Sequence, residues 1–151
     1  MVLLPLIAAR IDLPIIAAGG ICDATSMAAA FVLGAEGVQM GTRMLATEES
    51  NVHQNFKDAI VAAGDDGTVL ISRPGNPTMR VLRNALTESD EPGQLLGNIT
   101  DLYFGGEMDA SVANTGQVSA RIDAILPVAD LIKEMWSGCT AALEAGRTRL
   151  G

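Results

Sequence analysis

The sequence predicts an α/β fold, because two short apolar runs flank a helical segment near its start. The first run, residues 14–18, begins at a proline and is followed by Gly19-Gly20, as expected of a strand buried on both faces. The second run, residues 37–40, is followed by Gly41-Thr42. Between them, residues 26–33 are rich in alanine, with apolar side chains at helical spacing. Strand, helix and strand follow within about thirty residues, the length of a βαβ unit with parallel strands.

The rest of the chain is predicted to be mainly helical. Helices are expected over residues 3–9, 51–63, 79–87 and 124–143, with a short extended piece at 68–72. Thr47-Glu48-Glu49-Ser50 offers a capped start to the helix at 51–63. Turns are expected at 73–77 and a polar loop at 88–97. No repeat, low-complexity segment or shift in composition marks a second domain.

Composition indicates an ordered protein with a tightly packed core. Of the 151 residues, 48% are hydrophobic but 3% are aromatic, so Ala, Val, Leu, Ile and Met are expected to form the core. The net charge of −8, from 10 basic and 18 acidic residues, excludes a basic face for nucleic acid, since phosphate contacts need clustered Lys and Arg.

Two features bear on where the protein is found. Cys22 and Cys139 lie far apart and outside metal-ligand spacing, which favours a reduced, cytoplasmic protein. The apolar start, residues 1–9, is too short to span a membrane and is expected to form a helix. We therefore expect no membrane partner.

Two glycine turns form the candidate binding site. Gly19-Gly20 and Gly41-Thr42 each follow a predicted parallel strand, and β/α barrels build their active sites at the carboxyl ends of their strands. Glycine lets the backbone approach an anion, and N–H groups at the start of the next helix can donate to a phosphate. Turn chemistry alone favours a simpler interpretation, in which both turns serve strand-to-helix geometry.

Three stretches of the sequence match one known family. They are PIIAAGGI at 14–21, LGAEGVQMGTR at 33–43 and ESNVH at 49–53, with looser matches at 73–83 and at Asn114-Thr115-Gly116-Gln117. Together they resemble the nitronate monooxygenase family, formerly called 2-nitropropane dioxygenases, which includes FMN-dependent enoyl-ACP reductases. The match runs through most of the chain and is dense over residues 13–57.

The resemblance implies a TIM (β/α)8 barrel, of which this chain is the C-terminal portion with a helical C-terminal extension. Residues 1–46 would supply the last βα units of a flavin-binding barrel. Residues 47–151 would form the mainly helical extension within the same structural unit.

The resemblance also implies FMN as cofactor, with its phosphate at the two glycine turns. The residues carried over are Gly19, Gly20, Gln39, Met40, Gly41 and Thr42. The implied reaction on a small-molecule substrate is oxidation of alkyl nitronates to a carbonyl compound and nitrite. The alternatives are an FMN-dependent enoyl-ACP reductase-like enzyme and a non-catalytic, truncated remnant or interaction module.

A catalytic residue is not assigned. Family members carry their catalytic histidine in a glycine-rich segment upstream of the two turns, and this sequence has no such segment. His53 does not correspond to that position and is expected to be structural or at the surface. Because two strands cannot close a barrel, we expect the chain to need an N-terminal barrel half or to self-associate.

The other chemistry-bearing residues have plainer interpretations. Asp23 is placed to cap a helix, and Cys22 is expected to be a small buried hydrophobe.

No metal site is expected, because Asp65-Asp66 and residues 88–91 lack complete hard-ligand spacing. Three arginines either line a pocket for an anionic tail or, as we favour, pair with acidic neighbours: Arg73, Arg80 and Arg83. Four methionines are expected in the core or lining a pocket: Met27, Met40, Met44 and Met79.

Overall fold

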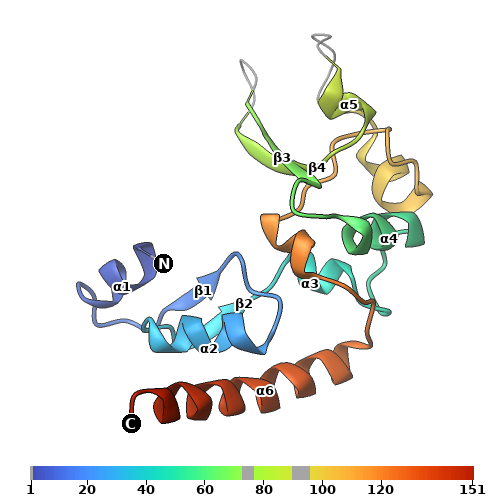
Figure 1. Ribbon diagram of the computed structural model, residues 1–151. Helices are drawn as coiled ribbons and strands as arrows, with labels where there is room; N and C mark the ends of the chain where they lie inside the picture. Colours follow the sequence, from blue (N-terminus) through green and yellow to red (C-terminus); the bar gives the residue numbers. More distant parts are fainter. Residues whose placement is uncertain (1, 73–76, 90–95) are drawn as a thin grey trace. The chain divides into compact units, whose positions relative to one another are not determined.

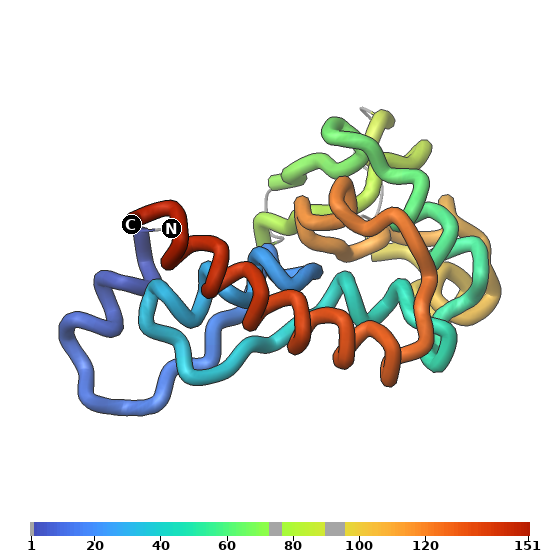
Figure 2. The backbone as a smooth tube through the Cα atoms, turned by 60° about the horizontal axis from the view of Figure 1, so that its bottom comes forward, coloured from blue at the N-terminus to red at the C-terminus, as the bar shows by residue number. Residues whose placement is uncertain are grey.

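The structure is a computed structural model that describes residues 2–72, 77–89 and 96–151. Its chain forms two units, which can be followed by colour in Figures 1 and 2. The first consists of Met1–Met40 and Pro127–Gly151, and the second of Gly41–Leu126. The boundary predicted between residues 46 and 47 falls inside the second unit and stays a prediction.

The first unit contains the predicted βαβ arrangement. Its elements before residue 41 are α1 (Leu3–Ala8), β1 (Ile16–Ala18), α2 (Ala24–Val32) and β2 (Gly37–Gln39). β1 and β2 pair in parallel, with Ile16 opposite Gly37 and Ala18 opposite Gln39. The predicted parallel pair is therefore confirmed, with each strand shorter than expected.

The prediction that the first strand is buried on both faces is wrong for this structure. Ile16, at the start of β1, is 59% exposed. In the described part of the chain, the sheet that contains β1 has two strands, and side chains on β1 remain open to solvent. Exposed apolar surface of this kind is what two strands that cannot close a barrel were expected to leave.

The start and the end of α2 follow from local chemistry. The Asp23 carboxylate accepts a hydrogen bond of 2.7 Å from the Ser26 N–H, and the Ser26 hydroxyl accepts one of 3.1 Å from the Asp23 N–H. This reciprocal capping box confirms the predicted role of Asp23. After the helix, Gly34 has a φ of +103°, a left-handed conformation that favours glycine and ends the helix.

The long helix α6 (Val128–Arg149) packs along α2 in the first unit (Figures 1 and 2). A Cβ placed on Gly138 would lie 2.6 Å from the Ala24 Cβ, so glycine allows the two helices to approach closely. The helix predicted over 124–143 exists but begins after Pro127, which fits a helix start and would break a helix interior. No helix in the described ranges combines the length and apolarity that crossing a membrane requires.

The second unit combines short helices with an antiparallel hairpin. Its elements are α3 (Thr42–Leu45), α4 (Gln54–Ala62), β3 (Thr68–Ile71), β4 (Met79–Leu82), α5 (Ala85–Glu88), a π-helix (Asp101–Gly105) and a 3-10 helix (Gln117–Arg121). β3 and β4 are antiparallel, with Thr68 opposite Leu82 and Ile71 opposite Met79. The extended piece predicted at 68–72 is confirmed as β3.

The helix predicted over residues 79–87 is wrong. Val81 in β4 is fully buried and packs in a cluster with Ile71 and Val112, which pairing with β3 makes possible. This tertiary packing overrides the helical spacing of the apolar residues. Asn84 then caps the separate short helix α5 by accepting a bond of 3.1 Å from the Thr87 N–H.

The start of α4 also differs from the prediction. His53 is its N-cap, and the imidazole Nδ1 accepts a hydrogen bond of 3.1 Å from the Asn55 N–H. Thr47 does not cap this helix, because its hydroxyl donates to the Met44 carbonyl at 2.8 Å and its backbone bridges Leu126. The histidine has the structural role that was expected of it.

An aromatic pair stabilises the interior of the second unit. Phe56 is fully buried and stacks on Tyr103, with ring centroids 4.8 Å apart. Burial raises the pKa of Tyr103, and a hydrogen bond with the Asn114 backbone offsets part of that rise. The folded protein therefore favours the neutral phenol.

Tyr103 is the one tyrosine of the chain, so its ionisation can be followed by ultraviolet difference absorbance. We expect the folded protein to titrate at higher pH than the unfolded chain, whose tyrosine pKa is about 10. Because the folded-state pKa is the higher one, the free energy of unfolding should fall as pH rises from about 10 through the folded pKa. Tyr103→Phe should remove this part of the pH dependence of the free energy of unfolding. Coincident titration of folded and unfolded chains would contradict the burial argument.

Close packing of α6 on α2 predicts that Gly138 tolerates no larger side chain. Gly138→Val should lower the free energy of unfolding by about 1–3 kcal/mol, because its Cβ meets Ala24. Gly146→Ala on the same helix is the matched control, since a Cβ there meets no described atom within 4 Å. It should raise stability by about 0.5–1 kcal/mol through helix propensity. Equal urea unfolding curves for the two variants would refute the close approach.

Candidate functional site

The register of the parallel strands brings four predicted site residues to one sheet edge. Ala18, the last residue of β1, lies opposite Gln39, the last residue of β2. Parallel strands end at the same edge, so Gly19-Gly20 and Met40 both continue from it. This edge is where open α/β sheets and barrels place ligands.

The first glycine turn needs glycine for its backbone conformation. Gly19 has a φ of +99° and Gly20 a φ of +75°, which L-residues with side chains rarely adopt. A Cβ on either residue would meet no described atom within 4 Å. The turn therefore faces open space, although its positive φ values alone already account for glycine.

Gly41 is different, because its conformation does not require glycine. Its φ is −101° and its ψ −77°, and it makes no side-chain cap for α3. A Cβ there would also meet no described atom within 4 Å. Neither turn geometry nor packing among the described residues accounts for this glycine.

Thr42 follows as the first residue of α3 and is buried. Its hydroxyl oxygen accepts a hydrogen bond of 2.7 Å from the Gly116 N–H, within the second unit. Next to it, the buried guanidinium of Arg43 donates from Nη1 to the Ala124 carbonyl at 2.9 Å. The basic side chain beside the turn therefore makes a hydrogen bond within the second unit.

The start of α2 is less suited to an anion than the sequence suggested. The N–H groups of Cys22 and Asp23 both donate to the Ser26 hydroxyl at 3.1 Å. The Asp23 carboxylate lies at the positive end of the helix, where a second negative charge would be repelled. Cys22 itself is buried, as expected.

The remaining predicted candidates have ordinary contacts. Arg80 donates to the Thr68 hydroxyl at 3.1 Å, and Arg83 donates to the Asp66 backbone carbonyl at 2.7 Å. Both of these bonds go to neutral oxygens, and the favoured pairing of the three arginines with acidic neighbours stays a prediction. Arg73 and residues 90–91 lie outside the described ranges.

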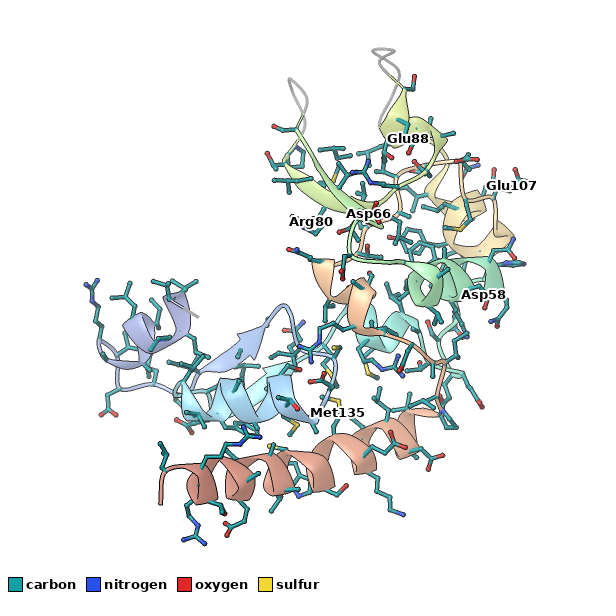
Figure 3. All side chains as sticks on the ribbon, in the orientation of Figure 1. Asp58, Asp66, Arg80, Glu88, Glu107 and Met135 are labelled. Atoms are coloured by element: carbon teal, nitrogen blue, oxygen red, sulfur yellow. The ribbon has the colours of Figure 1, made fainter. Side chains whose placement is uncertain are left out.

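Acidic side chains are dispersed over the second unit. Asp58, Glu88 and Glu107 lie on α4, on α5 and after the π-helix, well apart in Figure 3. Within the residues that the structure describes, no three His, Cys, Asp or Glu side chains are grouped to hold a metal ion. Of the predicted methionines, Met27 is buried, Met79 packs against the Val81 cluster, and Met40 and Met44 are half-buried.

Sequence reasoning did not predict the contact between Thr42 and Gly116. The two residues are 74 positions apart, so no local pattern could connect them. The looser family match at Asn114-Thr115-Gly116-Gln117 was the one available signal that this segment belongs near the site.

Comparison with known proteins places the whole arrangement in one family. The family described as nitronate monooxygenase matches residues 1–138. Curated relatives include probable nitronate monooxygenases of Staphylococcus aureus: strain JH9, 34% identical over 140 residues, and strain Newman, 35% over 136 residues. Each alignment covers 90% of this chain and 36% of the relative, so the chain spans little more than a third of their length.

Solved structures show the same fold over almost the entire chain. FabK from Thermotoga maritima superposes with a TM-score of 0.88 at 35% identity, over 98% of this chain and 51% of that one. A nitroalkane oxidase from Streptomyces ansochromogenes superposes with a TM-score of 0.75 at 24% identity, over 95% and 44%. The latter likeness concerns fold alone. Because the family match extends over residues 1–138, this chain belongs to the nitronate monooxygenase family.

Proposed function

We propose that this chain supplies the FMN-phosphate site of a flavin-dependent oxidoreductase, as the C-terminal portion of a TIM barrel. Family membership supports an oxidoreductase of the nitronate monooxygenase kind. The observation that carries the phosphate site is Gly41, whose backbone does not need glycine and whose missing side chain leaves open space.

The residues proposed to hold the phosphate are Gly19, Gly20, Gln39, Met40, Gly41 and Thr42. Backbone N–H groups of the glycine turns and the Thr42 hydroxyl are neutral donors, which suits a chain of net charge −8. We assign the phosphate to these turns rather than to the first turn of α2, because Asp23 already places a carboxylate there. FMN would supply the redox chemistry, and these residues would bind and orient it.

The proposed reaction is oxidation of a small alkyl nitronate to a carbonyl compound and nitrite. A second candidate is an enoyl-ACP reductase-like reaction, which the 35% identity to FabK from Thermotoga maritima supports. The two candidate reactions can be distinguished by the compound that reduces the bound flavin. Anaerobic bleaching by an alkyl nitronate favours the first, and bleaching by a reduced nicotinamide favours the second.

Flavin binding by the chain itself is the primary test. Titration of FMN into the purified protein should perturb the visible flavin bands and yield a saturable binding curve. Gly41→Val should weaken binding by about tenfold or more, because its side chain fills the space assigned to the phosphate while its φ remains allowed. Gly20→Val should also weaken binding, with backbone strain contributing because its φ is +75°.

Gly146→Val is the matched control, since a Cβ at this α6 glycine also meets no described atom. It should bind FMN as the unmodified chain does. Unchanged binding in Gly41→Val would remove the basis for the phosphate site. Unperturbed flavin bands with the unmodified chain would indicate either that it needs the expected N-terminal barrel half to bind flavin or that the non-catalytic alternative holds.

A further inference from the structure

Gly116 lies directly against the hydroxyl of Thr42. Its N–H donates to Thr42 Oγ1 at 2.7 Å, and a Cβ built on Gly116 would lie 3.2 Å from the same oxygen. Gly116 has a φ of −86° and a ψ of 160°, extended values that any residue adopts. A side chain here would therefore press on the Thr42 hydroxyl, whereas the backbone conformation itself does not call for glycine.

The chain around Gly116 is held on both sides by hydrogen bonds. Before it, the Leu82 N–H donates to the Ala113 carbonyl at 2.9 Å, and the Thr115 N–H donates to the Arg80 carbonyl at 3.2 Å. These bonds and a bridge at Asn114 align the segment with β4.

On its other side, the Gly116 carbonyl accepts two bonds from Ser119. The Ser119 backbone N–H lies 3.1 Å away and its hydroxyl 2.9 Å away, and Ser119 is fully buried. The N–H that meets Thr42 therefore projects from a segment with little freedom to move.

This bond determines what the Thr42 hydroxyl can offer a ligand. A hydroxyl has one proton to donate and two lone pairs that accept. The Gly116 N–H occupies the accepting side, and the described part of the chain provides no acceptor for the Thr42 proton. The hydroxyl is thereby oriented as a donor, which suits a phosphate because a fully ionised phosphate ester can only accept hydrogen bonds.

We propose that Gly116 is a positioning residue for the cofactor phosphate: its N–H orients the Thr42 hydroxyl as a donor, and its lack of a side chain leaves that hydroxyl undisplaced. This inference rests on the proposed FMN site and adds a residue that acts through Thr42 without touching the ligand. It predicts an effect confined to the phosphate. Binding of the rest of the flavin should not depend on Gly116.

Riboflavin lacks the phosphate of FMN, so the ratio of the two dissociation constants isolates that group. The unmodified chain should bind FMN more tightly than riboflavin. Thr42→Val should lower this preference by about tenfold or more, because it removes a hydrogen bond to a charged group. Gly116→Ala should lower it about three- to tenfold by displacing the hydroxyl. Thr42→Ser, which keeps the hydroxyl, should retain most of it.

Gly105→Ala is the matched control in the same unit, because its Cβ would make an ordinary contact of 3.7 Å with Asp101. It should leave the FMN preference unchanged. A ligand-free readout tests the bond itself. Amide hydrogen exchange at Gly116 should become faster in Thr42→Val, because the N–H loses its acceptor, and should stay slow in Thr42→Ser.

The outcomes separate the two proposals. An unmodified chain without preference for FMN overturns the phosphate site, and the role of Gly116 with it. A clear preference that Thr42→Val lowers but Gly116→Ala retains overturns the role of Gly116 alone, and a preference that both variants retain overturns the role of the Thr42 hydroxyl as well. Equal weakening of FMN and riboflavin by Gly116→Ala would indicate a purely structural glycine and also overturn the inference.

Discussion

The parallel pairing of β1 with β2 is the constraint on which the candidate site depends. Because Ala18 lies opposite Gln39, both strands end at the same edge, and the chain leaves that edge through Gly19-Gly20 and through Met40. A shift in register by one residue would move the ends of the two strands apart along the sheet, since a strand rises about 3.3 Å per residue. The α2 helix between the strands makes this pairing possible, and its Asp23 capping box sets where it begins.

Charge decides which donors can serve an anion in this chain. The net charge is −8, and the positive end of α2 already carries the Asp23 carboxylate. Arg43, beside the second turn, donates to the Ala124 carbonyl and is buried. The proposed phosphate site therefore relies on neutral donors, namely backbone N–H groups at glycine and the Thr42 hydroxyl. Such donors act through geometry, and the proposed role of Gly116 accordingly rests on one hydrogen bond of 2.7 Å to Thr42.

The predictions that succeeded concern features that depend on residues close together in the sequence. The βαβ unit, the Asp23 cap and the stop at Gly34 depend on contacts within a few positions. The failures concern segments whose structure is decided from a distance. Residues 79–82 have helical spacing but form β4, because pairing with β3 buries Val81. Thr47 is a good helix cap in isolation, yet its hydroxyl and backbone are used by Met44 and Leu126.

The sequence by itself determined the family, the two glycine turns and the parallel unit that carries them, because apolar periodicity, glycine and capping residues act locally. It could not distinguish glycines required by backbone conformation from glycines required by space. That distinction needed tertiary structure: Gly20 has a positive φ, whereas Gly41 and Gly116 have ordinary backbones. At Gly116 the neighbour that a side chain would press on is the Thr42 hydroxyl, whose oxygen lies 2.7 Å from the Gly116 nitrogen although the two residues are 74 positions apart.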